Sequence, residues 1–346
     1  MSDFLKTESL LWEHGKGGYS LFHVFGVIAA DDVVLAFAEA RALGKDAGEA
    51  HDIVMRRSTD GGNSFEESVC LFGGERCLVN PTPIYDTQTG RVLLFFAENH
   101  ENTYTVLYLS HSDDLGITWS APQDVTHFIT EKADTNFHLP GPTHGIQLQK
   151  KPYTGRLLLQ LWHRGSDVTL PRTERGYCVS LLYSDDHGKS WAHTAPLGHT
   201  YHANESALCE TREGVMWALR SFGTQHAMTK STDGGVTWSA VQKMPLPPAF
   251  ACQAGLVSLP DFENIPETIL LSRVSRPEKE CRRDMELCLS YDDGVTFPVH
   301  YALPQGDATP GYSDLCALDS GKTVGLLHCH EGRVLFTRIP VQNLLA

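Results

Sequence analysis

Short runs of apolar residues recur along the whole chain, and each run ends close to Gly, Pro, Asn or Asp. Seven runs have the length and the β-rich composition of strands; they lie at 33–40, 91–98, 105–112, 156–163, 178–184, 215–221 and 268–274. Such runs, followed by turn residues, predict β-strands. No segment longer than about a dozen residues keeps a helical period. The nearest, 39–52, contains two glycines. The pattern therefore predicts an all-β protein.

Five segments repeat the pattern Ser-x-Asp-x-Gly-x-[Ser/Thr]-[Trp/Phe], and we call them the repeat turns: 58–65, 112–119, 184–191, 231–238 and 290–297. Ser and Asp side chains bond nearby backbone N–H groups, and Gly supplies positive φ. The aromatic residue is expected to pack against its own hairpin. Recurrence of this kind marks an array of similar units, each the size of a four-stranded propeller blade. The pattern lacks the terminal Glu of a calcium loop, so we interpret it as a structural turn away from any functional site.

Composition and charge narrow the class of protein. The 346 residues are 41% hydrophobic and 20% charged, which suits a globular protein, and we expect one domain over 1–346. A net charge of −14 argues against a nucleic-acid partner, although an arginine cluster can still attract an anionic ligand locally. No apolar stretch approaches the ~20 residues of a membrane span, and we read no leader sequence. The nine cysteines include no CxxC pair, so we expect reduced, mostly buried thiols in a cytoplasmic protein.

Several longer segments resemble the sialidase (neuraminidase) superfamily. They include "LAFAEAR" (35–41), "DIVMRRSTDGG" (52–62), "GPTHGIQL" (141–148), "NESALCETREGVMWALRS" (204–221), "RRDMELCLSYDDG" (282–294) and "GYSDLCALDSGKTVGLL" (311–327). The repeat turns resemble the Asp boxes of that superfamily. The resemblance implies a six-bladed β-propeller with one blade that lacks a repeat turn, closed by both chain ends. It also implies a retaining exo-glycosidase that hydrolyses α-ketosides of sialic acid or of a related 2-keto-3-deoxy sugar acid.

The resemblance assigns catalytic roles residue by residue. In the family a Tyr nucleophile is activated by a Glu, and three arginines grip the substrate carboxylate. Tyr312 in "GYSDL" matches the nucleophile, and Glu205 in "NES" matches its activator. Arg220 and Arg282 match the second and third arginines, with Arg283 as the alternative in register. Arginine suits this task because its planar fork binds a carboxylate through two parallel hydrogen bonds.

Two positions depart from the family pattern. His23 in "FHVFGV" stands where the first arginine is expected, and Phe25 replaces a proline. A histidine makes a single-point contact and is only partly charged at neutral pH. The family's acid/base Asp falls in "GKDAGEAHDIV", which offers three carboxylates, Asp46, Glu49 and Asp52. We favour Asp46, because "DAG" resembles the family's Asp-x-Gly, and we expect Asp52 to be structural.

Further substrate-binding candidates come from motifs that approach the pocket in the family. The main ones are Arg41, His144 and Gln253, and weaker ones are Glu39, His138, Arg164 and Cys252. The "HCH" at 328–330 places two histidines on one strand face, but no third ligand stands at a supporting spacing. No cofactor or metal is implied. The expected partner is an acidic sugar or glycoconjugate, and the oligomeric state stays open.

Two other functions compete with this interpretation. The altered first arginine is compatible with a hydrolase or lyase on the same scaffold that acts on a different acidic sugar. A propeller that binds sugars without catalysis is the second alternative. A Tyr–Glu pair argues against a mere binding protein, because binding alone does not require a nucleophile with its base.

Overall fold

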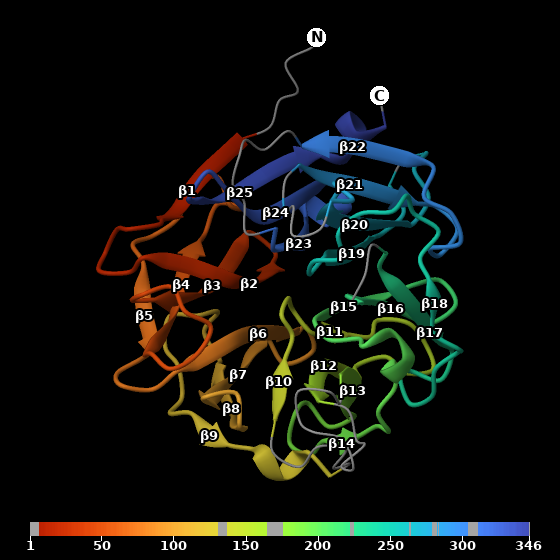
Figure 1. Ribbon diagram of the computed structural model, residues 1–346. Helices are drawn as coiled ribbons and strands as arrows, with labels where there is room; N and C mark the ends of the chain where they lie inside the picture. Colours follow the sequence, from red (N-terminus) through yellow and green to blue (C-terminus); the bar gives the residue numbers. More distant parts are fainter. Residues whose placement is uncertain are drawn as a thin grey trace.

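The structure, a computed structural model, describes residues 7–130, 137–164, 176–221, 225–262, 264–278, 282, 284–303 and 311–345. These residues form six antiparallel sheets around a common centre, which Figure 1 shows face-on. The described residues contain no α-helix and only short 3₁₀ turns: η1 (Thr126–Phe128), η2 (His199–Tyr201), η3 (Asp319–Gly321) and η4 (Val341–Leu344). The predicted all-β, six-bladed propeller is confirmed.

Five blades follow the chain from the centre outwards. Blade 1 contains β2 (Leu21–Ala30), β3 (Val33–Arg41), β4 (His51–Ser58) and β5 (Val69–Phe72), and blade 2 contains β6 (Leu78–Asp86), β7 (Arg91–His100), β8 (Tyr104–Ser112) and β9 (Gln123–Asp124). Blade 3 contains β10 (His138–Pro140), β11 (Ile146–Gln147), β12 (Leu157–Arg164), β13 (Tyr177–Ser184) and β14 (Ala192–His193). Blade 4 contains β15 (Ser206–Glu210), β16 (Val215–Leu219), β17 (Ala227–Ser231) and β18 (Gln242–Lys243). Blade 5 contains β19 (Gly255–Leu259), β20 (Thr268–Val274), β21 (Met285–Ser290) and β22 (Val299–Leu303).

Blade 6 closes the ring with both ends of the chain. Its inner strands are β23 (Ser313–Leu318), β24 (Thr323–His330) and β25 (Arg333–Pro340), and the N-terminal strand β1 (Thr7–Glu13) adds outside β25. This is the blade without a repeat turn, as the sequence predicted. Closure by β1 joins the first and last blades through backbone hydrogen bonds, so the ring does not depend on side chains alone.

The seven strands predicted from apolar runs all occur, as β3, β7, β8, β12, β13, β16 and β20. The segment 39–52, which came nearest to a helical pattern, instead ends β3, forms a loop and begins β4. The first strands of neighbouring blades, such as β2 and β6 or β19 and β23, contact one another around the axis. Their ends are therefore the places where residues distant in sequence meet.

The repeat turns connect the third and fourth strands of blades 1 to 5, counted from the centre outwards; in blade 3 these are β13 and β14. In the turn at 112–119, the Ser112 hydroxyl accepts a hydrogen bond from the Gly116 N–H at 2.8 Å. The Asp114 carboxylate accepts bonds from the Thr118 N–H at 2.8 Å and from its hydroxyl at 2.6 Å. Gly116 has φ of +87°, a conformation that glycine adopts without steric cost. The side-chain roles expected from the sequence are thus observed.

Aromatic residues of the repeat turns pack both on their own blade and on a neighbouring blade. Trp238 of blade 4 packs against Trp217 of the same blade, with ring centroids 4.9 Å apart, as expected. Trp191 of blade 3 packs edge-on against Phe95 of blade 2, with ring centroids 5.1 Å apart. Phe65 of blade 1 likewise packs against Phe336 of blade 6 at 5.3 Å. The expected packing within one unit therefore describes only part of what these rings do. The reason is that a blade is a single sheet, so its second face can be covered only by the next blade.

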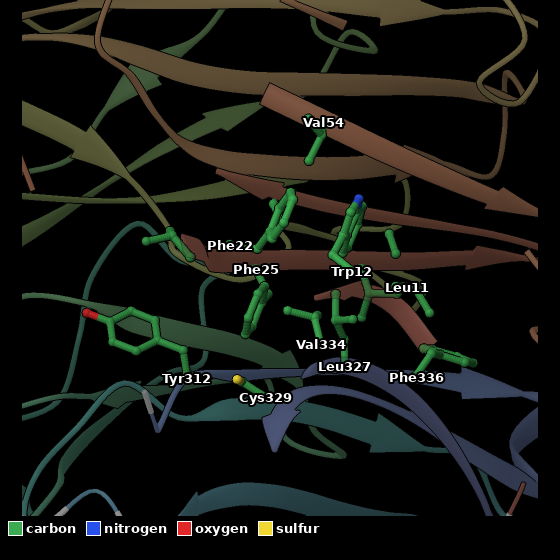
Figure 2. Close-up of a cluster of buried hydrophobic side chains, with 14 of the residues drawn as sticks. Leu11, Trp12, Phe22, Phe25, Val54, Tyr312, Leu327, Cys329, Val334 and Phe336 are labelled. Atoms are coloured by element: carbon green, nitrogen blue, oxygen red, sulfur yellow. The ribbon is translucent and has the colours of Figure 1, made fainter. Parts of the chain in front are cut away.

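Apolar cores lie between successive blades. The largest cluster fills the joint between blade 6 and blade 1 and includes Phe25, Phe336 and the ring of Tyr312, as Figure 2 shows. Eight described cysteines are free thiols, and all except Cys70 are buried. This agrees with the expected reduced state, while Cys281 lies outside the described residues. In the described part of the chain no helix has the length and hydrophobicity needed to cross a membrane.

Replacement of a repeat-turn serine should destabilise the fold. In blade 5 the buried Ser290 hydroxyl accepts from the Gly294 N–H and donates to Asp292, both at 2.8 Å. We expect Ser290→Ala to lower the free energy of unfolding by ~1–3 kcal/mol, because a buried N–H loses its acceptor. Urea denaturation measures this. In the same turn Val295 is 60% exposed, so Val295→Ala should change stability by less than about 0.5 kcal/mol. Equal effects of the two substitutions would contradict the role given to Ser290.

Candidate active site

A polar pocket of about 310 Å³ opens where the inner strands converge. Each of the six blades contributes at least one residue to its lining, and no residue of a repeat turn lines it. Its lining comprises His23, Val24, Glu39, Arg41, Asp46, Val79, Asn80, Asn99, Asn102, Phe137, Leu139, Trp162, Arg164, Tyr177, Glu205, Arg220, Arg282 and Tyr312. The pocket thus gathers most of the chemistry-bearing residues that the sequence singled out.

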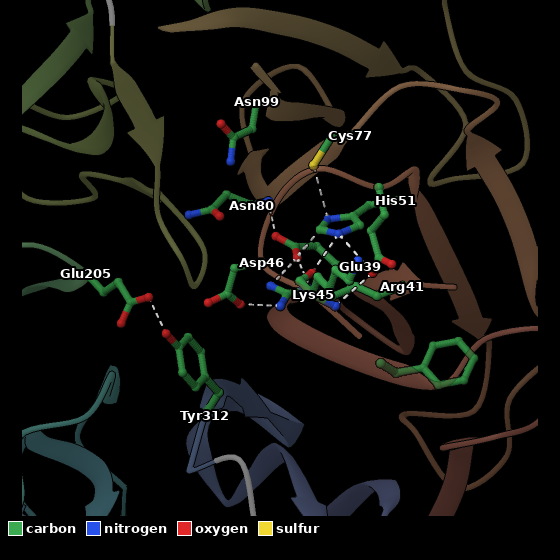
Figure 3. Close-up of polar contacts among 12 residues, drawn as sticks. Glu39, Arg41, Lys45, Asp46, His51, Cys77, Asn80, Asn99, Glu205 and Tyr312 are labelled. Atoms are coloured by element: carbon green, nitrogen blue, oxygen red, sulfur yellow. Dashed lines mark hydrogen bonds and ion pairs between the residues drawn. The ribbon is translucent and has the colours of Figure 1, made fainter. Parts of the chain in front are cut away.

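A phenol, a carboxylate and a guanidinium meet at one side of the pocket. The Tyr312 hydroxyl donates to Glu205 Oε1, and Arg220 Nη1 donates to Glu205 Oε2. Figure 3 shows the phenol and the carboxylate facing each other from separate strand ends. Arg220 Nη1 also lies 3.4 Å from the phenolic oxygen. Tyr312 and Glu205 are 5% and 9% exposed, so this cluster is withdrawn from bulk water.

The local strand pairing explains why Glu205 and Arg220 are neighbours. The backbone N–H of Arg220 donates to the carbonyl of Glu205 at 2.9 Å, which extends the β15–β16 hairpin by one pair. Directly opposed residues of an antiparallel pair hold their side chains on the same face. Tyr312 immediately precedes β23 of blade 6, which is separated from blade 4 by blade 5. Local sequence therefore pairs Glu205 with Arg220, and only ring closure adds Tyr312.

Burial and charge keep the phenol protonated in the empty pocket. Burial, followed by the negative charge of Glu205, raises the pKa of Tyr312 well above its ordinary value, and Arg220 opposes the shift. Burial alone would lower the pKa of Arg220, but the charge and hydrogen bond of Glu205, together with the nearby Tyr312 and Cys252, outweigh burial and raise that pKa. The arginine is thus a fixed cation. The phenol retains its proton until a reaction draws electron density from its oxygen.

His23 lies in the pocket beside the phenol ring. A bulge in β2 between His23 and Gly26 breaks the pairing register with β3, and Val24 there has φ of +53°. Bulges re-aim side chains next to functional sites. The His23 and Tyr312 ring centroids are 4.1 Å apart. Gly26 is required at the bulge because an added Cβ would lie 2.7 Å from the Pro81 carbonyl oxygen.

The imidazole of His23 is held in its neutral form. Burial lowers its pKa well below the ordinary value, and the charges of Arg41, Arg282 and Arg220 lower it further. Desolvation is the largest cause of this lowered pKa. His23 Nδ1 has no hydrogen-bond partner among the described residues. The position of His23 in the pocket therefore carries no fixed charge.

The three acid/base candidates occupy different environments. Asp46 lines the pocket, its side chain is 90% exposed, and its Oδ1 lies 2.5 Å from Arg41 Nη1. Glu49 accepts hydrogen bonds from the backbone N–H groups of Leu43 and Lys45, so it holds the loop. Asp52 accepts a 2.5 Å hydrogen bond from the Tyr19 hydroxyl, as expected of a structural residue. Only Asp46 is at the pocket with access to solvent.

Glu39 and Arg41 point to the same side of β3 and pair with each other. Arg41 Nη2 lies 2.7 Å from Glu39 Oε2, and the fully buried Glu39 also accepts from the Asn80 N–H at 2.7 Å. Figure 3 shows this group beside Asp46. Burial would lower the pKa of Arg41, but the charges and hydrogen bonds of Glu39 and Asp46 together outweigh burial and raise that pKa. Arg41 is thus committed to two carboxylates of its own chain.

The guanidinium of Arg282, from blade 5, lies near the ring of Tyr312. Its guanidinium carbon lies 5.7 Å from the centroid of the Tyr312 ring. Arg283, the alternative in register, lies outside the described residues. Four arginines of the pocket face three carboxylates, so the lining carries one net positive charge while His23 is neutral. This sign is opposite to the −14 of the whole chain and favours an anionic ligand.

An amide and aromatic wall of the pocket was not predicted from the sequence. Asn80, Asn99 and Asn102 come from blade 2, and Trp162 and Tyr177 come from blade 3. Trp162 and Tyr177 pack edge-on with centroids 5.4 Å apart. One signal was present: Arg164 was among the candidates, and Trp162 two residues earlier must share its face of the strand.

Two of the predicted substrate-binding residues are not brought to the pocket. His144 Nδ1 lies 2.9 Å from Asp314 Oδ1, and His144 lines a different cavity. Gln253 is 1% exposed and binds the backbone of Ser313, with both its amide and its carbonyl oxygen at 2.9 Å. The motifs containing them approach the pocket, but these side chains point beneath it. His138 and Cys252 are likewise buried and do not line the pocket.

One group of three side chains could meet at a metal ion among the residues that the structure describes. It comprises Glu286, Cys288 and His300 on β21 and β22. His300 Nδ1 lies 3.1 Å from Glu286 Oε2 and 3.5 Å from Cys288 Sγ. Arg273 Nε donates to Glu286 Oε1 at 2.7 Å, so a cation already neutralises this carboxylate. None of these three residues lines the pocket.

Sequence comparison relates the chain to sialidases. It is 26% identical to a sialidase of Micromonospora viridifaciens over 94% of this chain and 52% of that protein. It is 28% identical to a sialidase of Bacteroides fragilis over 82% of this chain and 55% of that protein. The chain thus spans about half the length of these curated relatives.

Comparison with solved structures and with family patterns agrees with the sequence comparison. The fold resembles the Hadza microbial sialidase Hz136 with a TM-score of 0.83 and 23% identity, covering 97% of this chain and 69% of that one. At this identity the likeness concerns the fold alone. Residues 32–329 match the family described as the BNR repeat-like domain, which is most of the chain. The chain therefore belongs to the BNR repeat-like domain family, within the sialidase superfamily.

Proposed function

We propose that the protein is a retaining exo-glycosidase that hydrolyses α-ketosides of sialic acid or of a related 2-keto-3-deoxy sugar acid. The observation that carries this proposal is the buried Tyr312–Glu205 hydrogen bond beside Arg220 and Arg282 in a pocket of net positive charge. A phenol paired with a carboxylate is a nucleophile with its own base. The sialidase homology supports the same class of reaction.

Binding begins with the substrate carboxylate. Arg220 and Arg282 offer planar guanidinium groups, each able to donate two hydrogen bonds to one carboxylate. A neutral nucleophile suits such a substrate, because an ionised carboxylate nucleophile would repel the substrate's own negative charge. The raised pKa of Tyr312 keeps the phenol neutral at this stage. The anomeric carbon of the bound sugar then faces the phenolic oxygen.

Two proton transfers accompany the bond changes. As the Tyr312 oxygen bonds to the anomeric carbon, its proton passes to Glu205. Asp46, which first takes up a proton from solvent, donates it to the departing glycosidic oxygen, which leaves as an alcohol. Asp46, now ionised, takes a proton from water; the water oxygen attacks the anomeric carbon, and Tyr312 leaves and recovers its proton from Glu205. Two displacements return the original anomeric configuration, and a Tyr nucleophile is a recognised exception to the two-carboxylate scheme.

Neutral His23 favours a second candidate substrate. Two arginines and an uncharged imidazole grip a carboxylate less strongly than three arginines do, so an acidic sugar other than sialic acid is the alternative substrate. Fluorogenic sialosides tested beside fluorogenic glycosides of other sugar acids distinguish the two. Binding of sugar acids by calorimetry, with no turnover of any of these glycosides, would instead favour a binding protein.

Removal of the phenolic oxygen should abolish turnover. In Tyr312→Phe the ring still packs in the core between blades 6 and 1, so we expect the wild-type melting temperature within a few degrees and measurable binding of a sugar acid. The rate should fall by at least about 10³-fold, because the nucleophile is missing. Steady-state kinetics and calorimetry measure the two effects. A kcat equal to that of the wild type would exclude Tyr312 as the nucleophile.

The acid/base assignment predicts a dependence on the leaving group. Asp46→Asn should lower the rate on alkyl glycosides by about 10²–10⁴-fold, because their alkoxide leaving groups require a proton. Aryl glycosides with acidic phenols should lose much less. Glu49→Gln keeps an acceptor for the loop N–H groups and serves as the comparison. A loss confined to poor leaving groups in Glu49→Gln, and absent in Asp46→Asn, would reverse the assignment.

His23 predicts a pH-dependent affinity. A bound carboxylate favours the protonated imidazole, so binding takes up a proton and KM should rise as pH increases between about pH 5 and 8. His23→Arg should remove this dependence and lower KM for sialosides by roughly ten- to a hundredfold, since a bidentate contact contributes ~1.5–3 kcal/mol. Kinetics on one fluorogenic sialoside across this range measures both. A low wild-type KM that does not change with pH would contradict the role given to His23.

A further inference from the structure

A short loop of blade 3 reaches the centre of the ring. Residues 141–144, which we call the axial loop, lie in the connection between β10 and β11, and Figure 1 shows this connection extending to the middle of the propeller. Leu139, two residues before the loop, lines the pocket, and His144, the last residue of the loop, lines a second cavity of about 590 Å³. The loop thus follows the lining of the pocket and ends at the lining of the second cavity.

Thr143 contacts two strands that carry pocket residues. Its N–H donates to the carbonyl of Phe25 at 3.1 Å, and Phe25 is two residues beyond His23. Its hydroxyl lies 3.4 Å from the carbonyl oxygen of Ser206, the residue after Glu205. Thr143 is fully buried and has φ of +84°, which is unfavourable for a β-branched residue. Such a conformation persists only where the surroundings impose it, and it is enriched at functional sites.

His144 contacts β23, the strand that begins directly after Tyr312. Its Nδ1 lies 2.9 and 3.1 Å from the two carboxylate oxygens of Asp314, two residues beyond Tyr312. Asp314 is fully buried and also accepts from the Val27 N–H of β2 at 2.8 Å. Burial would lower the pKa of His144, but the charge of Asp314 and its hydrogen bond together outweigh burial and raise that pKa. The pair is therefore a buried ionic contact between blades 3 and 6 with a branch to blade 1.

Gln253 supports the same strand from blade 5. Its side-chain amide donates to the Ser313 carbonyl, and its carbonyl oxygen accepts from the Ser313 N–H. These two bonds occupy both backbone groups of the residue that follows Tyr312. Together with the His144–Asp314 contact from blade 3, these bonds from blade 5 restrain the backbone that carries the phenol.

We propose that His144, together with Thr143 and Gln253, positions the catalytic groups by tying the strand ends that carry His23, Glu205 and Tyr312. This inference rests on the proposed function. The loop touches neither substrate nor phenol, so these are positioning residues. A displacement of the nucleophile by about 1 Å is enough to cost on the order of 10²-fold in rate.

The variants separate positioning from general stability. His144→Leu fills much of the same space but cannot donate to Asp314, whereas His144→Asn keeps a donor at the position of Nδ1. His187→Leu is the matched control: its Nδ1 lies 2.8 Å from Asp86 and joins two blades at a repeat turn, away from the pocket. All four proteins are compared by melting temperature and by kinetics on a glycoside that the wild type hydrolyses.

We expect kcat of His144→Leu to fall by about 10- to 100-fold with KM changed by less than about threefold, because the arginines still hold the substrate. His144→Asn should recover most of the rate, and His187→Leu should keep the wild-type kcat even if it melts earlier. A kcat of His144→Leu within about twofold of the wild type would overturn the proposal. So would an equal loss in His187→Leu.

Two further measurements keep the test decisive. If His144→Leu does not fold, Thr143→Val, which loses the hydroxyl bond to Ser206, should lower kcat, and Thr143→Ser should restore it; equal rates would overturn the proposal. If the wild type hydrolyses none of the glycosides, the proposed function fails by itself. Crystal structures then decide the proposal: the Tyr312–Glu205 bond should be kept in the wild type and in His144→Asn, and lost in Thr143→Val.

Discussion

One carboxylate shared between a phenol and a guanidinium is the contact on which the pocket is built. Glu205 is charged and almost fully withdrawn from water, which is unfavourable unless its oxygens are satisfied. Tyr312 satisfies one oxygen and Arg220 the other. The same arrangement keeps the phenol protonated and sets a proton acceptor beside it. The stability of the buried charge and the nucleophilic role proposed for Tyr312 therefore depend on the same two hydrogen bonds.

The propeller provides this contact because it separates fastening from function. The repeat turns lie between the third and fourth strands, where their Ser and Asp side chains hold the hairpin and their aromatic rings pack, as Phe65 and Trp191 do, on the neighbouring blade. The first strands surround the axis and leave their ends to the pocket. The repeated pattern can thus recur five times without any copy entering the site.

The charge of the pocket follows from which arginines are already paired. Arg41 is committed to Glu39 and Asp46, whereas Arg220 donates to Glu205 through one nitrogen, Nη1. Position 23 carries a histidine, whose imidazole is held neutral by burial and by the cations around it. The pocket therefore has only a small surplus of positive charge. Each substitution that alters this surplus should act on affinity more than on the chemical step.

The sequence by itself determined the strands and the five repeat turns, because both follow from residues close together in the chain, and the family resemblance added the six blades and the one that lacks a repeat turn. It did not determine on which blade an aromatic ring packs, or which side of an inner strand faces the pocket. His144 and Gln253 stand in motifs that reach the axis, yet their side chains do not line the pocket, and Asn80 lines it although no local pattern predicted this. Tyr312 meets Glu205 across 107 residues of sequence. Only closure of the ring decides such contacts, because bulges and blade-to-blade packing set the final direction of each side chain.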